Sequence, residues 1–184
     1  MYSPRFFAAV WIGMGVPVWS QGQGLIIFNN RVTPEVNARV TFQDGTPVGA
    51  GFTAQLYGGP AGTPVDGLTP LLPTTTFRLS SPAALGYVQQ VEVPVPGVPR
   101  FGDATVQMRV YNGASWETSL IRGESNLIVV RTASETSPPA NLVGLQPFQV
   151  FLIPEPGMMT LLAGGAAALL AFHLRGASEG DRDL

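Results

Sequence analysis

The sequence holds few residues that could do chemistry, and the first of them is a single histidine. His173 lies in an apolar stretch near the C-terminal end of the chain. A Ser-His-Asp triad and a histidine-based zinc site both require histidine beside their partners. The sequence also has no cysteine, so we expect no thiol nucleophile, no cysteine zinc site and no disulfide scaffold. We therefore predict no metal and no cofactor.

Paired carboxylates are the remaining route to catalysis, because two acidic side chains can hydrolyse a glycoside without histidine. Glu92 and Glu117 alternate with apolar neighbours, which predicts that they face solvent. Asp66 and Asp103 are expected in loops, but no run of alternating acids supports a calcium site there. A carboxylate-based glycoside hydrolase is therefore the third hypothesis, and we predict no catalytic residues and no enzymatic activity. The acidic side chains considered are Asp44, Asp66, Glu92, Asp103, Glu117 and Glu124.

Aromatic side chains offer a second kind of site, because a ring face can stack on a sugar. A carbohydrate-binding module acting on exopolysaccharide is therefore the second hypothesis. For Trp116, a place in the hydrophobic core is the main alternative to ligand binding. The possible ligand-binding residues are Tyr57, Tyr87, Tyr111 and Trp116.

Nucleotide and nucleic-acid binding are disfavoured by glycine context and by charge. The glycine clusters "GAGF" and "GGPAG" are not followed by a helical pattern, and the chain has no lysine. A phosphate loop needs both, so these clusters are predicted to be turns. Ten arginines stand against twelve acidic residues, for a formal net charge of -2. No basic face is expected to hold phosphates, so nucleic acid is not a predicted partner.

The N-terminal stretch has the pattern of an export signal. Arg5 is followed by an uncharged apolar run from Phe6 to Val18. Thirteen helical residues cover roughly 20 Å, which is too short for a bilayer core of about 30 Å. Residues 1–20 are therefore predicted to be a signal peptide cleaved between Ser20 and Gln21, because small residues stand one and three positions before that bond. Cleavage after Gly22 or Gly24, or a buried N-terminal helix, are the alternatives.

The C-terminal stretch has the pattern of a membrane anchor. Residues 157–174 contain no acidic residue, lysine or arginine, and as a helix they would reach about 27 Å, just enough to span a bilayer core. Pro156 suits the first turn of such a helix, and Glu155 would lie at its positive end. Arg175 would flank the membrane at the other end. We expect a transmembrane helix over 157–174 and a cytoplasmic tail over 175–184.

The order of these features resembles the PEP-CTERM sorting domain. In that family a Pro-Glu-Pro motif, here Pro154, Glu155 and Pro156, precedes an apolar helix and arginine behind a signal peptide. The resemblance implies processing at or near the motif by an exosortase, a membrane-embedded cysteine transpeptidase. Stretches such as "GAGFTAQLYGGPAGTP" and "RGESNLIVV" also look like PEP-CTERM proteins of Verrucomicrobia-like bacteria. The family usually ends in an arginine cluster, whereas Arg175 is followed here by "GASEGDRDL".

The elements between the two ends, residues 21–153, are predicted to be strands. "ATVQMRVY" and "FTAQLY" alternate apolar and polar residues, as half-buried antiparallel strands do. Asp44-Gly45 and Asn112-Gly113 are expected as two-residue hairpin turns, and "VEVPVPGVPRFG" and "RTASETSPPANL" as long loops. The predicted fold is all-β, an antiparallel β-sandwich of Ig-like or jelly-roll type. The predicted strands are 25–32, 38–43, 52–57, 75–79, 87–95, 104–111, 116–121, 126–131 and 147–153.

Together these features predict an exported, non-enzymatic cell-surface or extracellular-matrix protein. The expected partners are an exosortase, the membrane through the C-terminal helix and, in the second hypothesis, exopolysaccharide. Before processing, the chain would be anchored in the membrane.

Overall fold

The computed structural model describes residues 23–133, 137–138 and 140–153. The predicted signal peptide with its Ser20–Gln21 bond, the motif Pro154–Pro156, the apolar helix and Arg175 all lie outside these residues. No helix within the described residues has the length and apolar character needed to cross a membrane.

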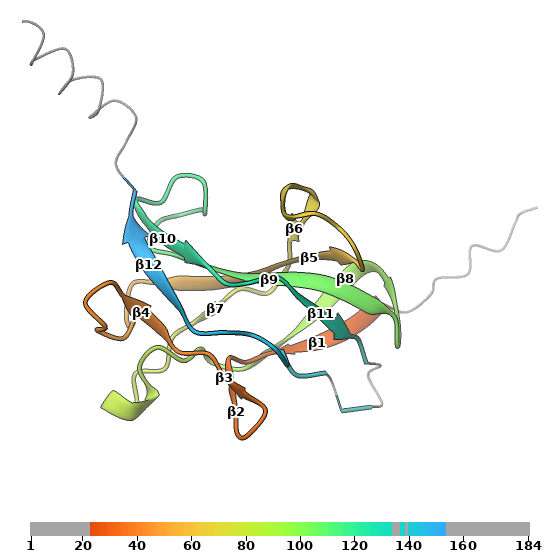
Figure 1. Ribbon diagram of the computed structural model, residues 1–184, viewed down its shortest axis with the longest axis horizontal. Helices are drawn as coiled ribbons and strands as arrows, with labels where there is room; N and C mark the ends of the chain where they lie inside the picture. The colour runs from red at the N-terminus through yellow and green to blue at the C-terminus, as the bar shows by residue number, and fades with distance from the viewer. Residues whose placement is uncertain (1–22, 134–136, 139, 154–184) are drawn as a thin grey trace, which may run out of the picture.

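The described chain is built almost entirely from strands, as predicted, and contains no α-helix (Figure 1). Two single-turn 3-10 helices, η1 (Val65–Gly67) and η2 (Pro82–Ala84), lie in the loops between strands. The strands are β1 (Gln23–Phe28), β2 (Arg31–Val32), β3 (Val36–Asn37), β4 (Val40–Phe42), β5 (Thr53–Pro60), β6 (Thr69–Pro70), β7 (Thr75–Thr76), β8 (Val91–Pro99), β9 (Asp103–Tyr111), β10 (Ile121–Glu124), β11 (Ile128–Arg131) and β12 (Phe148–Leu152).

The largest sheet has eight strands and is mixed. Its main path runs β4-β12-β10-β9-β5-β6, while β11 also pairs with β9 and β7 with β5. The prediction of a purely antiparallel arrangement is wrong for this sheet, because β12 runs parallel to β4. Parallel neighbours need a long connection, and here the whole of the chain from β5 to β11 lies between them.

A second sheet pairs β1 with β8 antiparallel, and both sheets contribute to one hydrophobic core. Ile26 and Phe28 of β1 are fully buried in the same cluster as Leu56 of β5 and Met108 of β9. The predicted inward set of "ATVQMRVY" is confirmed, since every second residue of β9 from Ala104 to Val110 is buried in this core. The core therefore follows the period-two pattern of the sequence.

Strand β8 covers the end of the predicted strand 87–95 and continues to Pro99, into the stretch 91–102 that is predicted to be a long loop. Residues two apart in a strand direct their N–H groups to the same edge, so Pro94 and Pro96 remove donors from one edge only. The other edge pairs with β1, while Val93 before the first proline and Val95 between the two are fully buried. The prolines therefore mark an edge strand of this sheet rather than a loop.

Of the two predicted hairpin turns, one is confirmed in place. Around Asp44-Gly45 the N–H of Phe42 donates to Thr46 O at 2.8 Å, and Gly45 has a φ of 83°. The loop has three residues, 43–45, and not two, which is the form in which a glycine with positive φ closes a type I turn.

The second predicted turn is wrong, and so is the strand predicted to follow it. Residues 112–120 form a long loop between β9 and β10, and β10 begins only at Ile121. The side chain of Asn112 accepts the N–H of Ile121 at 3.1 Å, and the Ser119 hydroxyl accepts the N–H of Gly113 at 2.8 Å. These side-chain bonds close the loop at nine residues and place Trp116 at its middle.

Candidate functional site

Three of the four predicted aromatic residues gather on the face of the large sheet opposite the core. Tyr57 and Tyr111 lie on β5 and β9, and Trp116 lies on the loop over them. The register pairs Tyr57 with Gln107, which places the two side chains on one face. The guanidinium carbon of Arg109 lies 4.1 Å from the Tyr57 ring centroid and 5.1 Å from that of Trp116. Arg109 is therefore the centre of the group.

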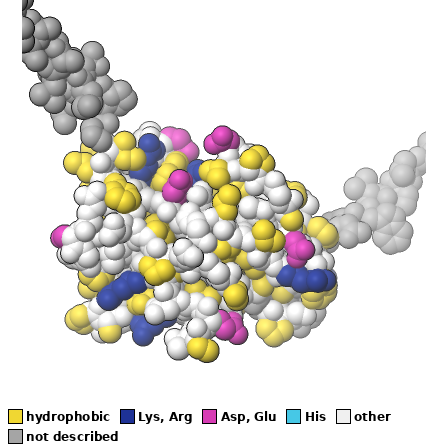
Figure 2. Space-filling view, viewed as in Figure 1, with side chains coloured by type: hydrophobic (Ala, Val, Ile, Leu, Met, Phe, Trp, Pro, Cys, Tyr) yellow, Lys and Arg dark blue, Asp and Glu magenta, His cyan; other side chains and the backbone are white. Residues whose placement is uncertain are grey.

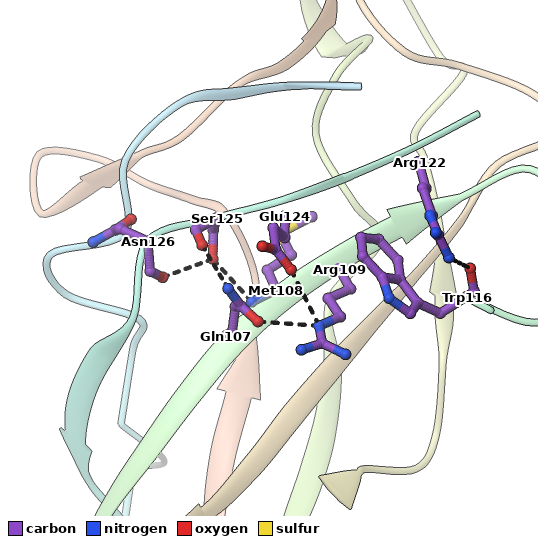
Figure 3. Close-up of polar contacts among 8 residues, drawn as sticks. All are labelled: Gln107, Met108, Arg109, Trp116, Arg122, Glu124, Ser125 and Asn126. Carbon is purple, nitrogen blue, oxygen red and sulfur yellow. Dashed lines mark hydrogen bonds and ion pairs between the residues drawn. The ribbon is translucent and has the colours of Figure 1, made fainter. Parts of the chain in front are cut away.

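Polar contacts tie Arg109 to its own strand and to β10 (Figure 3). Its Nε donates to Gln107 Oε1 at 3.0 Å and lies 3.5 Å from Glu124 Oε2. The Arg109 side chain is only 12% exposed, whereas that of Glu124 is 47% exposed. This cation is therefore largely buried, as a charge can be when it is paired and hydrogen-bonded.

Trp116 is held between two arginines. Figure 3 shows the indole between the side chains of Arg109 and Arg122, and each guanidinium carbon lies 5.1 Å from its ring. Nη1 of Arg122 also donates to the backbone oxygen of Trp116 at 2.6 Å. Trp116 is half-buried and lies outside the hydrophobic core. We call Tyr57, Gln107, Arg109, Trp116, Arg122 and Glu124 the Arg109 cluster.

The polar groups around the cluster are paired within the chain. The Tyr111 hydroxyl donates to Gln55 Oε1 at 3.0 Å, and Gln55 Nε2 donates to Leu71 O at 3.1 Å. Gln107 Nε2 donates to Ser125 O at 3.0 Å. Within the described residues, Arg122 Nε is the one buried side-chain nitrogen or oxygen without a hydrogen-bond partner. This face of the sheet is therefore a buried polar network with almost no unused hydrogen-bonding capacity.

The charges of the cluster act on Glu117, which lies on the same loop and is exposed. The pKa of Glu117 is lowered by hydrogen bonds from its own backbone N–H and from Ser115, and further by the positive charges of Arg109 and Arg122. A general acid of a glycosidase needs a raised pKa, so that it holds its proton at neutral pH. Glu117 has the opposite shift and does not fit that role.

Tyr57 and Tyr111 shift in the direction that burial dictates. Burial raises the pKa of Tyr57, with a further rise from the negative charge of Glu117. Burial likewise raises the pKa of Tyr111, assisted by Tyr57 and Glu117. Both phenols therefore stay neutral and act as hydrogen-bond and ring partners, not as bases.

Tyr87, the fourth predicted aromatic residue, lies in a different group. Its hydroxyl donates to Asn37 Oδ1 at 2.6 Å, and the guanidinium carbons of Arg31 and Arg39 lie 4.7 and 5.7 Å from its ring centroid. Arg39 Nε also donates to Leu85 O at 2.9 Å. Tyr87 is buried, and its neighbours hold the η2 segment against β2 and β3.

The acidic side chains considered for catalysis are all exposed, and for Glu92 and Glu117 this confirms the prediction. Two of the six share a partner, because Glu117 and Glu124 both interact with Arg109. No group of three or more acidic, histidine or cysteine side chains in the described residues is placed to hold a metal ion. An open hollow of about 510 Å³ beside Glu124 is lined by Arg39, Thr41, Glu124, Pro147, Phe148, Gln149 and Phe151. None of the four aromatic candidates lines it.

Sequence reasoning missed the arginines that organise this face. Arg109 lies on the predicted half-buried strand 104–111, among its polar positions, whereas Arg122 lies between the predicted strands 116–121 and 126–131. The cue that was available is that "VQMRVY" and "TAQLY" both carry Gln and Tyr at alternate positions, with Arg between them in the first. No family model, curated protein or solved structure matches the chain.

Proposed function

We propose that this chain is an exported, non-enzymatic surface protein that is delivered by its C-terminal tag and processed by an exosortase. The proposal rests on the resemblance of residues 154–175 to the PEP-CTERM sorting domain. One structural observation supports it most directly. Within the described residues the last strand, β12, ends at Leu152, and in the sequence Pro154 begins the motif two residues later. The tag thus follows the β domain without a separate spacer.

The fold part of the proposal is a β-sandwich, with Ig-like and jelly-roll forms as the alternatives. It is supported by the shared core of the β1–β8 sheet and the eight-stranded sheet. A domain of this kind can fold outside the cell without disulfides, because a single core of this size can suffice. In this proposal the domain is the cargo, and the surface or extracellular matrix is its destination.

Carbohydrate binding is the weaker candidate because the aromatic side chains are already engaged. Trp116 stacks with two arginines, Tyr57 with one, and Tyr111 uses its hydroxyl on Gln55. A sugar-binding aromatic platform needs a free ring face. Binding of the purified chain to an exopolysaccharide array, lost in Trp116→Ala, would favour this candidate over a purely structural role for the cluster.

The experiment that tests the proposed sorting compares two Gram-negative hosts that differ only in an exosortase gene. We expect the chain to lose residues 1–20 in both hosts and to lose its C-terminal segment at or near Pro154–Pro156 only where the enzyme is present. Intact mass spectrometry of the surface and membrane fractions measures both cuts. An identical C-terminus in the two hosts would contradict the proposal.

A further inference from the structure

The end of the domain at which β12 stops carries a group of exposed apolar side chains. Leu152 is 69% exposed, Leu120 45%, Phe151 43% and Ile153 38%. These residues are neighbours, since the N–H of Ile153 donates to Leu120 O at 2.7 Å and Leu152 lies opposite Ile121. Figure 2 shows hydrophobic side chains gathered at this end, beside basic and acidic ones. We call Leu120, Phe151, Leu152 and Ile153 the apolar end.

The loop over β10 adds groups that suit a lipid headgroup layer. Trp116 and Arg122 lie next to the apolar end, since Arg122 pairs with Phe151 in register. Tryptophan and arginine are both favoured where apolar and aqueous phases meet. Glu117 is also exposed on this loop, and its charge offsets that of Arg122. The surface therefore suits headgroups without net charge.

The length of chain after Ile153 restricts where this end can lie. Four Cα steps separate Ile153 from Gly157, where the apolar stretch begins, and an extended chain covers at most about 14 Å in four steps. The headgroup layer on one side of a bilayer is about 5–8 Å thick, from a total thickness of 40–45 Å and a core of 30 Å. If the stretch 157–174 spans the bilayer, Ile153 lies within or just outside the headgroup layer.

We propose that the apolar end docks on the zwitterionic lipid surface while the C-terminal anchor is in the membrane. The proposal rests on the anchor of the proposed function and adds to it a second contact, made by the β domain itself. The docked end would hold the Pro-Glu-Pro motif at the membrane surface. A membrane-embedded processing enzyme would meet it there.

Single cysteines test this contact, because the chain has none of its own. Leu120→Cys and Leu152→Cys each provide one thiol at the apolar end, which is labelled with an environment-sensitive fluorophore. Phe101→Cys is the matched control, since Phe101 is a hydrophobic residue 53% exposed in the β8–β9 turn. The nine residues of β9 separate it from the loop 112–120 by about 30 Å. Each full-length labelled chain is reconstituted in phosphatidylcholine vesicles.

We expect at least a two-fold rise in emission, a blue shift and quenching by spin-labelled lipid at positions 120 and 152, and none of these at 101. Labels at 120 and 152 that behave like the one at 101 would overturn the docking. A blue shift that grows with the protein-to-lipid ratio would also overturn it, because a second copy would then cover the end.

Two further measurements separate docking from tethering and from anchoring. Twelve Gly/Ser residues inserted between Ile153 and Pro154 relax the tether, and we expect at least half of the emission rise to survive. Its complete loss would show that proximity alone produced the signal and would overturn the docking. Carbonate extraction reports the anchor separately. Extraction of the chain would overturn the anchor and the docking together, whereas a retained chain with unshifted labels would overturn the docking alone.

Discussion

The Arg109 cluster and the apolar end depart from the usual distribution of side chains in opposite ways. In the cluster, Tyr57, Gln107 and Arg109 are largely buried on the outer face of β5 and β9, and nearly all of the polar groups there have partners within the chain. At the apolar end, large hydrophobic side chains are exposed, and the described residues do not cover them. Both regions meet on β10, which carries Arg122 and Glu124 and is bonded to β12.

The difference shows which of the two regions requires something outside the described chain. A buried polar network whose members hydrogen-bond to one another can be explained by its contribution to the stability of the fold. The exposed apolar patch next to Pro154 has no such structural explanation, because exposing large apolar side chains to water does not stabilise the fold. We therefore infer that the Arg109 cluster stabilises the fold, and that the apolar end contacts something outside the described residues.

Gly123→Ala is expected to have the largest effect on stability. Gly123 lies on β10, where the Arg109 cluster and the apolar end meet. A Cβ at Gly123 would lie 2.2 Å from the backbone oxygen of Gln149 on β12, which has little freedom to move. We expect a loss of about 3 kcal/mol in the free energy of unfolding, or no folded protein. Urea unfolding followed by circular dichroism measures it.

The control for this change is Gly45→Asn, at a turn glycine with nothing within 4 Å of an added Cβ. Asparagine tolerates the positive φ of this position, so only a small loss is expected. Equal stability of Gly123→Ala and the unchanged protein would show that β10 and β12 are not packed as described.

Arg109→Met tests whether the cluster is structural. The change keeps an apolar stem but removes the contacts with Tyr57 and Trp116 and the bond to Gln107. We expect a loss of about 2 kcal/mol in the free energy of unfolding. Arg109→Lys keeps the charge without the planar guanidinium and should fall between the two. Thermal unfolding of the three proteins side by side decides the order, and an unchanged midpoint for Arg109→Met would refute a structural role.

High pH sharpens the same point through the two tyrosines of this face. The pKa values of Tyr57 and Tyr111 are raised by burial, whereas in the unfolded chain both ionise near pH 10. Their contribution to stability is therefore complete below about pH 10 and is lost as the pH rises through the higher folded values. The loss is at most about 1.4 kcal/mol per pH unit for each tyrosine. We expect Tyr57→Phe and Tyr111→Phe to flatten the fall of the melting temperature between pH 10 and 12.

Leu152→Asn is expected to have the smallest effect on folding. Its side chain is 69% exposed, so the free energy of unfolding should change by less than about 0.5 kcal/mol. Differential scanning calorimetry of the unanchored domain is the appropriate measurement. A loss as large as that of Arg109→Met would mean that the apolar end is part of the folding core, and the contrast between the regions would fail.

The sequence predicts the inner face of the sheets better than the outer one. Alternation identifies Ala104, Val106, Met108 and Val110 as core residues, because burial of apolar groups is recorded directly in their spacing. The outer face depends on the loop 112–120, which folds back over the sheet. No local sequence pattern predicts this. Asn112-Gly113 has the composition of a tight turn, yet long-range pairing of β10 with β9 and β12 sets the loop length. Pro94 and Pro96 mislead for a similar reason, since only the position of β8 at an edge makes them compatible with a strand.

The central claim, that the Pro-Glu-Pro motif is read by a processing enzyme, is tested most directly by Glu155→Gln. As a charge at the start of a helix, Glu155 would contribute only about 0.3–1 kcal/mol, and an inserted anchor would survive its loss. The variant and the unchanged chain are expressed in a host that carries an exosortase, and the C-terminus of each is read by intact mass. We predict that the unchanged chain loses its C-terminal segment and that Glu155→Gln accumulates as the longer, membrane-held precursor. Equal processing of the two chains would contradict the account and leave the motif as the start of a helix.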